Sequence, residues 1–369
     1  MNQLFRWDQT GLFLLALAAG ILPFAVPEVC AAALREGLAL CSGPLLLSLF
    51  PFLVVSRLLI QCPESDLLAL PFRLAAWGIG IRTPCAARVL CIGFLGGFAP
   101  AASAAAQAVR TGQLTAEEAD ALLPACICSG PSFVVLTVGQ SLLGSAELGM
   151  LLFASQITAN YLTAALLNRF AGVRSVKPGS AAPASPAPPR LDEILADAAI
   201  TYCKLCGFIL FFRMLAAGAG ALLPAGAGTL CAVLLEVCSG CDLASRTGRW
   251  GSLLCCAALS VQGLSVLLQV RTICPPEMTL RPLYRARMLH LPLSLALFYL
   301  LLPGGEADVF STLPARVLLM RRVPPDCALL VFAVCCMAAC TLRSGIRQVE
   351  QKQMARNAGG CCINSKTLL

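Results

Sequence analysis

Long apolar runs separated by short polar segments occupy most of the chain. A helix needs about 20 consecutive apolar residues to cross the hydrocarbon core of a bilayer, and about eight windows approach that length. These windows are 10–33, 37–60, 121–143, 148–170, 194–223, 250–270, 287–303 and 325–342. The pattern therefore predicts an all-α polytopic membrane protein with about eight spans.

Glycine and proline interrupt several of these runs. The interruptions read "GGFAPAAS" at 96–103, "CSGP" at 128–131, "EVCSG" at 236–240 and "QGLS" at 262–265. Hydrocarbon offers no partner for the backbone groups that a broken helix exposes, so each break must face protein or a water-filled cavity. We therefore expect broken or re-entrant helices.

A connector rich in proline, alanine and serine divides the chain into two parts of comparable length, and this composition neither spans a membrane nor packs into a core. Each part has an apolar helix with one arginine, Arg57 or Arg213, followed by two broken segments, although the spacings differ. Internal repeats of this kind build transporter sites near the middle of the membrane, so we expect two inverted repeats. The predicted organisation is an N-terminal membrane helix (1–36), a first gate-like repeat (37–170), the linker (171–191), a second gate-like repeat (192–303), a loop with a last membrane helix (304–342) and a basic cytoplasmic tail (343–369).

Composition supports the membrane assignment, because the chain is 58% hydrophobic and 12% charged with a mean hydropathy of +0.80. The net charge of +8 reflects topology rather than nucleic-acid binding, since basic residues flank the connector and fill the tail. That pattern places the tail in the cytoplasm, whereas Arg316, Arg321 and Arg322 oppose this placement, so the orientation stays open. The N-terminal run resembles a signal peptide, but its length favours an uncleaved first helix.

The chain has 21 cysteines, and two pairs, Cys203 with Cys206 and Cys238 with Cys241, have a spacing that zinc sites use. Both pairs lie in or beside apolar helices, and His290 is the only histidine, so we expect reduced, buried thiols and neither a metal nor a cofactor. His290 has no evident catalytic partner, and the protein is therefore not expected to be an enzyme.

Two breaks in the first part can bind anions. A helix that starts at Ser129 and Gly130 would leave free N–H groups at its positive end. The break at Gly97, with Pro100 in the first turn and Ser103 one turn on, can act in the same way. The alternative for each is a simple helix kink.

Glu236 lies on a break with Ser239 and Gly240, in apolar surroundings. A carboxylate at the bilayer centre costs roughly 2.5–3.5 kcal/mol on insertion scales. One interpretation is a structural carboxylate satisfied by Arg213, Lys204 or a hydroxyl. The other is coupling to substrate or cation, with its proton as a candidate coupling species.

Gln262, Ser265 and Gln269 are three and four residues apart, so they would share one helix face. Such a stripe indicates either interhelical hydrogen bonds or a lined cavity. Thr115 and Glu118 fit a capping box, and we assign no chemistry to the acids beside them.

The segment "GGFAPAASAAAQAVRTGQLTAEEADALLPACICSGPSFVVLTVG", together with "LLEVCSGCDLA" and "SVQGLSVLLQVRT", resembles the YlbJ-type sporulation integral membrane proteins, which carry a nucleoside-recognition or gate domain. The likeness runs from about 50 to about 299. It implies a core similar to that of concentrative nucleoside transporters and a role in moving dipicolinic acid across the outer forespore membrane of a spore-forming bacterium. The chain departs from the family pattern at the 128–131 turn, at Cys238 in place of a threonine and at Gln262 in place of a glycine.

The resemblance and the breaks together predict a transporter for a small anionic metabolite, dipicolinate in the first instance, with a proton or cation as coupling species. Arg57 and Arg213 are the candidate anion partners, although either can instead snorkel to the interface. The alternatives are a carrier of nucleosides or other polar solutes, and a non-transporting scaffold in spore assembly. No nucleotide-binding loop is present in the sequence, and a homo-oligomer stays open.

Overall fold

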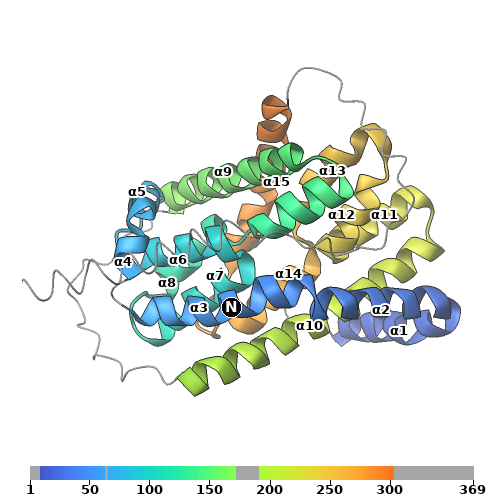
Figure 1. Cartoon of the computed structure of the whole chain (residues 1–369), viewed down its shortest axis with the longest axis horizontal. Helices are drawn as coiled ribbons and strands as arrows, with labels where there is room; N and C mark the ends of the chain where they lie inside the picture. Colours follow the sequence, from blue (N-terminus) through green and yellow to red (C-terminus); the bar gives the residue numbers. More distant parts are fainter. Residues whose placement is uncertain (1–8, 63–64, 172–190, 303–369) are drawn as a thin grey trace, which may run out of the picture.

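The structure is a computed structural model that describes residues 9–62, 65–171 and 191–302 (Figure 1). Within these ranges every regular element is a helix. The predictions for 304–342 and 343–369 lie outside the described residues, as does most of the linker.

The helices of the first part are α1 (Gln9–Ala25), α2 (Pro27–Ser42), α3 (Pro44–Gln61), α4 (Ser65–Leu68), α5 (Leu70–Gly78), α6 (Pro84–Gly96), α7 (Phe98–Arg110), α8 (Ala116–Cys126), the π-helix η1 (Ser132–Leu142) and α9 (Ala146–Ala171). Those of the second part are α10 (Leu191–Leu222), α11 (Ala225–Leu235), α12 (Val237–Ser245), the 3-10 helix η2 (Gly248–Trp250), α13 (Gly251–Val261), α14 (Gly263–Ile273) and α15 (Arg281–Leu301).

Three stretches of the described chain are long and apolar enough to cross a bilayer. They are Ala146–Ala171, Leu191–Leu222 and Gly248–Ile273. A fourth is formed if the bent pair α1 and α2 counts as one span. Length and composition thus identify an all-helical integral membrane protein.

The predicted single span at 10–33 is wrong, because α1 and α2 meet at an angle of 107°. Pro27 begins α2, and Val26 before it has φ −140°. A proline disfavours the helical conformation in the residue that precedes it, so the chain turns at this point. The predicted span at 121–143 is likewise divided into α8 and η1, and 37–60 is interrupted at Gly43.

The four predicted breaks are confirmed, and they lie against one another in pairs. A Cβ added to Gly97, between α6 and α7, would lie 2.7 Å from the amide nitrogen of Gly130, which precedes η1. A Cβ added to Gly263, at the start of α14, would lie 2.9 Å from the amide nitrogen of Glu236, between α11 and α12. In both parts, therefore, the first broken pair of helices meets the second at its break.

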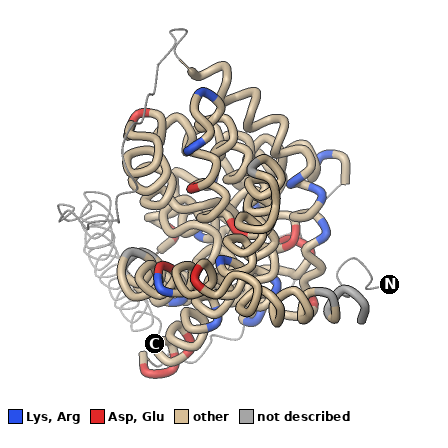
Figure 2. The backbone as a smooth tube through the Cα atoms, turned by 90° about the vertical axis from the view of Figure 1, so that its right-hand side faces the viewer, with Lys and Arg blue, Asp and Glu red and all other residues tan. Residues whose placement is uncertain are grey.

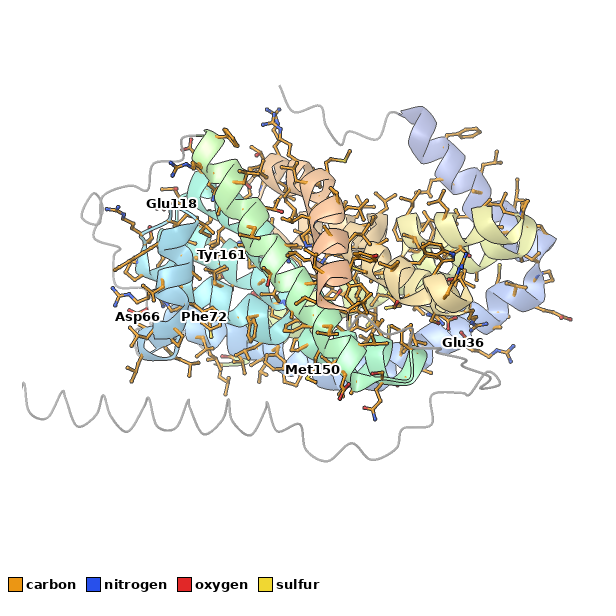
Figure 3. All side chains as sticks on the ribbon, turned by 90° about the horizontal axis from the view of Figure 1, so that it is seen from above. Glu36, Asp66, Phe72, Glu118, Met150 and Tyr161 are labelled. Atoms are coloured by element: carbon orange, nitrogen blue, oxygen red, sulfur yellow. The ribbon has the colours of Figure 1, made fainter. Side chains whose placement is uncertain are left out.

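Long helices hold these broken pairs in place. α9, marked by Met150 and Tyr161, crosses the molecule and packs against α8, η1 and α15 (Figure 3). α10 packs against α2, α3, α11 and α14, and further contacts between α7 and α14 join the two parts of the chain. Alanine makes close packing possible in α7, where Ala101, Ala104 and Ala105 have no exposed surface.

Charged residues are sparse, and some of them form ion pairs across helices. Figure 2 shows long stretches of the described chain without charge. Arg88 on α6 pairs with Asp66 at 3.1 Å and donates to the Ile60 carbonyl. The capping box is confirmed, because Thr115 and Glu118 each accept from the backbone of the other. These contacts satisfy polar groups in a chain that offers few of them.

Candidate functional site

The breaks of both parts line one cavity of about 60 Å³, which we call the break cavity. It contains five of the predicted site residues: Gly97, Ser129, Gly130, Glu236 and Gln269. Residues 96–98 and 129–130 come from the first part of the chain and 236–238 from the second. The cavity therefore lies where the two parts meet.

Three residues that line the break cavity have unpaired backbone donors. The amide N–H groups of Gly130, Ser132 and Phe133 donate to no group of the described chain, and the first bond of this turn runs from Val134 N to the Gly130 carbonyl, at 3.0 Å. The predicted cap by Ser129 is wrong, because no side chain caps η1 and Pro131 occupies the N-cap position. The helix is also a π-helix, which no local sequence pattern predicted. Its free N–H groups nevertheless suit an anion.

Glu236 also lines the break cavity and is itself the N-cap of α12. Its carboxylate accepts from Cys238 N at 2.9 Å and from Ser239 N at 2.7 Å, and only 2% of the residue is exposed. The positive end of α12 is thus already occupied by a negative charge of the protein. Ser239 contributes its backbone to this cap, and Gly240 allows α12 to lie against Val233 of α11.

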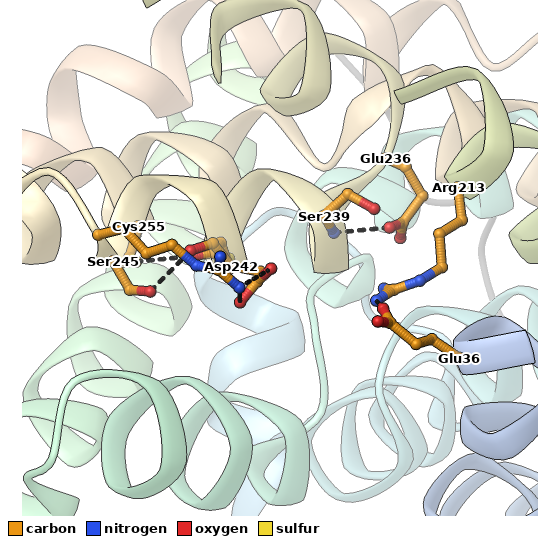
Figure 4. A network of polar contacts seen from close by, with 9 residues as sticks. Glu36, Arg213, Glu236, Ser239, Asp242, Ser245 and Cys255 are labelled. Atoms are coloured by element: carbon orange, nitrogen blue, oxygen red, sulfur yellow. Dashed lines mark hydrogen bonds and ion pairs between the residues drawn. The ribbon is translucent and has the colours of Figure 1, made fainter. Parts of the chain in front are cut away.

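Arg213 does not neutralise Glu236 by an ion pair. Its side chain lies near Glu236, but its guanidinium forms an ion pair with the carboxylate of Glu36 on α2, with 2.7 Å between Nη2 and Oε2 (Figure 4). The expectation that Arg213 or Lys204 satisfies Glu236 is therefore wrong, since backbone N–H groups do so. Arg213 does not line the break cavity either.

The predicted polar stripe is only partly formed. Gln269 donates to Ser265 at 2.9 Å, so these two share a face of α14. Gln262 instead precedes the helix in the left-handed conformation, with φ 62°, and its side chain reaches the Ile127 carbonyl at 3.4 Å. The Oε1 atom of Gln269 is buried without a partner in the described chain, and Gln269 lines the break cavity. This atom is a free acceptor for a ligand.

Two further predicted residues lie in a different place. Arg57 and Ser103 line a second cavity of about 160 Å³, which we call the basic cavity, together with Asp197. Arg57 forms an ion pair with Asp197 and donates to Ser103 at 3.4 Å. Pro100 is buried in the first turn of α7 and lines neither cavity. The site predicted from the sequence therefore combines residues that line two separate cavities.

A buried polar network that the sequence did not reveal supports two of the breaks, the one at 128–131 and the one at 262–265. Arg287 on α15 donates to the Ile127 carbonyl at 2.6 Å and to the Ser260 carbonyl at 3.4 Å. His290 contacts the Gln156 carbonyl at 3.2 Å. Gln156 in turn donates to Ser260 at 2.9 Å. These contacts hold the ends of α8 and α13 against α9 and α15.

The described cysteines form no disulfide, and ten of them are buried. Cys203 is an exception to the prediction, because it is exposed, while Cys206 and Cys238 are half-buried. No group of three metal-ligating side chains occurs in the described ranges.

The fold at the first pair of breaks depends on Gly97. With φ 81° and ψ −163°, it adopts a conformation that is essentially restricted to glycine. We expect Gly97→Ala to destabilise the protein by about 1–3 kcal/mol from backbone strain, and by more from the contact with Gly130. Thermal unfolding of the detergent-solubilised protein measures this loss. Gly112→Ala is the control, because Gly112 also has positive φ but its Cβ would meet nothing within 4 Å; equal losses in both variants would contradict close contact between the breaks.

Comparison of the chain with known protein families, with curated proteins and with solved structures finds no match in any of the three.

Proposed function

We propose that the protein is a membrane carrier that binds a small anion in the break cavity. The observation that carries this proposal is that three residues with free N–H groups, Gly130, Ser132 and Phe133, line the same cavity as the buried residue Glu236. The N–H groups supply an anion site that needs no basic side chain. Arg57 and Arg213, which are engaged by Asp197 and Glu36, are not needed for it.

The same geometry implies coupling to a cation. A substrate carboxylate on the N–H groups and the carboxylate of Glu236 would place two negative charges in one cavity of about 60 Å³. Like charges repel strongly where the dielectric constant is low. A proton on Glu236, or a cation between Glu236 and Gln269, removes that repulsion, so substrate and cation would enter together.

The order of elements supports two repeats around this cavity. In the first part, a long helix (α3) is followed by the broken pair α6 and α7, the broken pair α8 and η1, and a second long helix (α9). In the second part, the corresponding order is α10, the broken pair α11 and α12, the broken pair α13 and α14, and α15. Two such units, inverted with respect to each other, would be able to expose the cavity to either side of the membrane in turn.

Dipicolinate is the substrate that we propose, with the outer forespore membrane as the site of action. The support is the sequence resemblance to the sporulation proteins and the match between a planar dicarboxylate and free N–H groups. A cavity of about 60 Å³ holds one carboxylate group but not the whole molecule, since a cavity of roughly 150 Å³ is needed for a benzene ring. Transport would therefore require the breaks to separate.

A nucleoside is the second candidate, because Phe98 and Phe133 both line the break cavity. Two aromatic rings can stack on a base, and Glu236 and Gln269 could accept hydrogen bonds from a ribose. Competition between uridine and dipicolinate for uptake distinguishes the two substrates.

Glu236→Gln tests the coupling. We expect this variant to bind substrate but to lose the dependence of uptake on a proton or sodium gradient, so that the ratio of uptake with and without the gradient falls to about 1. Glutamine keeps the shape and one acceptor for the α12 cap but carries no charge. The measurement is uptake per folded molecule in vesicles, with Glu147→Gln on the exposed first turn of α9 as control. Gradient-driven uptake at the normal level in Glu236→Gln would remove Glu236 from the mechanism.

A further inference from the structure

The basic cavity collects charge from three helices, which belong to both parts of the chain. Its lining includes Arg57 on α3, Arg110 at the end of α7 and Lys204 on α10, and Asp197 is the only acidic residue in it. Hydroxyl groups of Ser103 and Thr201 lie beside Arg57. Three cations, one carboxylate and these hydroxyls leave an excess of positive charge and of hydrogen-bond donors.

Arg57 is the most buried of these cations, with 10% of its side chain exposed, whereas 60% of the Asp197 side chain is exposed. A buried guanidinium requires an anionic or polar partner, and Asp197 supplies one from the surface. Exposed ion-pair partners contribute little to stability because water competes with them. Asp197 can therefore swing away when another anion reaches Arg57.

We infer that the basic cavity is an anion-binding site for a carboxylate or phosphate group, in which the ligand displaces Asp197 from Arg57 and is held in addition by Arg110 and Lys204. Its volume of about 160 Å³ admits a phosphate group or one carboxylated ring. This site shares no lining residue with the break cavity, and the inference does not depend on the proposed transport function.

Two sources can provide such an anionic group. A soluble dicarboxylate would approach through the charged rim formed by Arg110 and Lys204. The phosphate of an anionic lipid headgroup would approach past Ile200, a lining residue that is 54% exposed and apolar. Both ligands use the same guanidinium and ammonium contacts.

The experiment uses the purified full-length protein in nanodiscs. Titration with pyridine-2,6-dicarboxylate by calorimetry covers the soluble ligand, and native mass spectrometry of discs with phosphatidylglycerol or phosphatidylcholine covers the lipid. We expect Arg110→Gln and Lys204→Gln each to weaken binding by about tenfold, the loss of one charge-assisted contact. We expect Asp197→Asn to tighten binding several-fold, because the competing carboxylate is gone. Arg246→Gln, at an exposed arginine that pairs with Asp242, should have no effect.

The outcomes separate the sources and the two cavities. Calorimetric binding that responds to these variants and persists in Gly130→Leu supports a soluble ligand in the basic cavity. Retention of phosphatidylglycerol that is lost in the double variant Arg110→Gln with Lys204→Gln supports a lipid headgroup. The inference would be overturned if neither probe bound, or if every probe that binds did so equally well in the double variant. Dicarboxylate binding that is lost only in Gly130→Leu would assign that ligand to the break cavity instead.

Discussion

Replacement of Gly130 by leucine is expected to reduce substrate uptake by about tenfold or more while the amount of folded protein stays near normal. Gly130 lines the break cavity, and the cavity has a volume of about 60 Å³. A leucine side chain would fill this space and cover the N–H groups of η1. Loss of one hydrogen bond to a charged group costs about 1.5–3 kcal/mol, which corresponds to roughly a tenfold to hundredfold loss of affinity.

Gly130→Ala is the matched control for this variant. A Cβ at this position would lie 3.5 Å from the backbone of Gly96 and 3.6 Å from the Gly97 nitrogen, which is ordinary van der Waals contact. Gly130 also has no positive φ, so alanine adds no backbone strain. The alanine variant should keep most of its uptake. If the leucine variant, at equal folded amount, transported as fast as the alanine variant, the anion would not bind at this break.

Removal of the Asp120 carboxylate is expected to cause the largest loss of stability. Asp120 on α8 is 6% exposed and accepts three hydrogen bonds from the start of α15. The donors are Thr279 N at 2.8 Å, the Thr279 hydroxyl at 2.7 Å and Leu280 N at 3.1 Å. Asp120→Ala leaves the buried Leu280 N–H without a partner, which costs about 1–3 kcal/mol, and it also removes the two hydrogen bonds from the exposed Thr279. We expect a total loss of about 2–5 kcal/mol.

Thermal unfolding in detergent measures this effect, with Glu117→Ala as control, because Glu117 lies on the same helix and is exposed. Asp120→Asn keeps an acceptor oxygen and should lie between the wild type and the alanine variant. A melting temperature of Asp120→Ala that equals that of Glu117→Ala would show that the contact between α8 and α15 does not hold the second part of the chain in place.

The sequence revealed the breaks because their causes are local. Glycine, proline and an isolated carboxylate interrupt an apolar helix wherever they stand, and all four predicted breaks are present. The bend between α1 and α2 had an equally local signal in Pro27. The apolar run continues past Pro27, and for that reason it was predicted to be one span. The positive φ of Gln262 also had an indication, since the family that the sequence resembles was expected to have glycine there.

The partners of the charged residues could not be predicted, because they lie far away along the chain. Arg57 and Asp197 are separated by 140 positions, Arg213 and Glu36 by 177, and each pair joins two helices whose packing the sequence does not specify. Arg57 and Arg213 therefore looked like free ligands for an anion. The same distance concealed the contact of Arg287 with the Ile127 carbonyl, 160 positions apart. Local patterns predict where a helix breaks, and tertiary packing decides what the break faces.

Uptake of radiolabelled dipicolinate into vesicles that contain only the purified protein is the decisive test of anion transport through the break cavity. We expect saturable uptake that is driven by an inward proton or sodium gradient, is strongly reduced in Gly130→Leu and loses its gradient dependence in Glu236→Gln. Uptake no greater than in protein-free vesicles, for dipicolinate and for uridine under every gradient, would contradict the claim that the break cavity is a transport site.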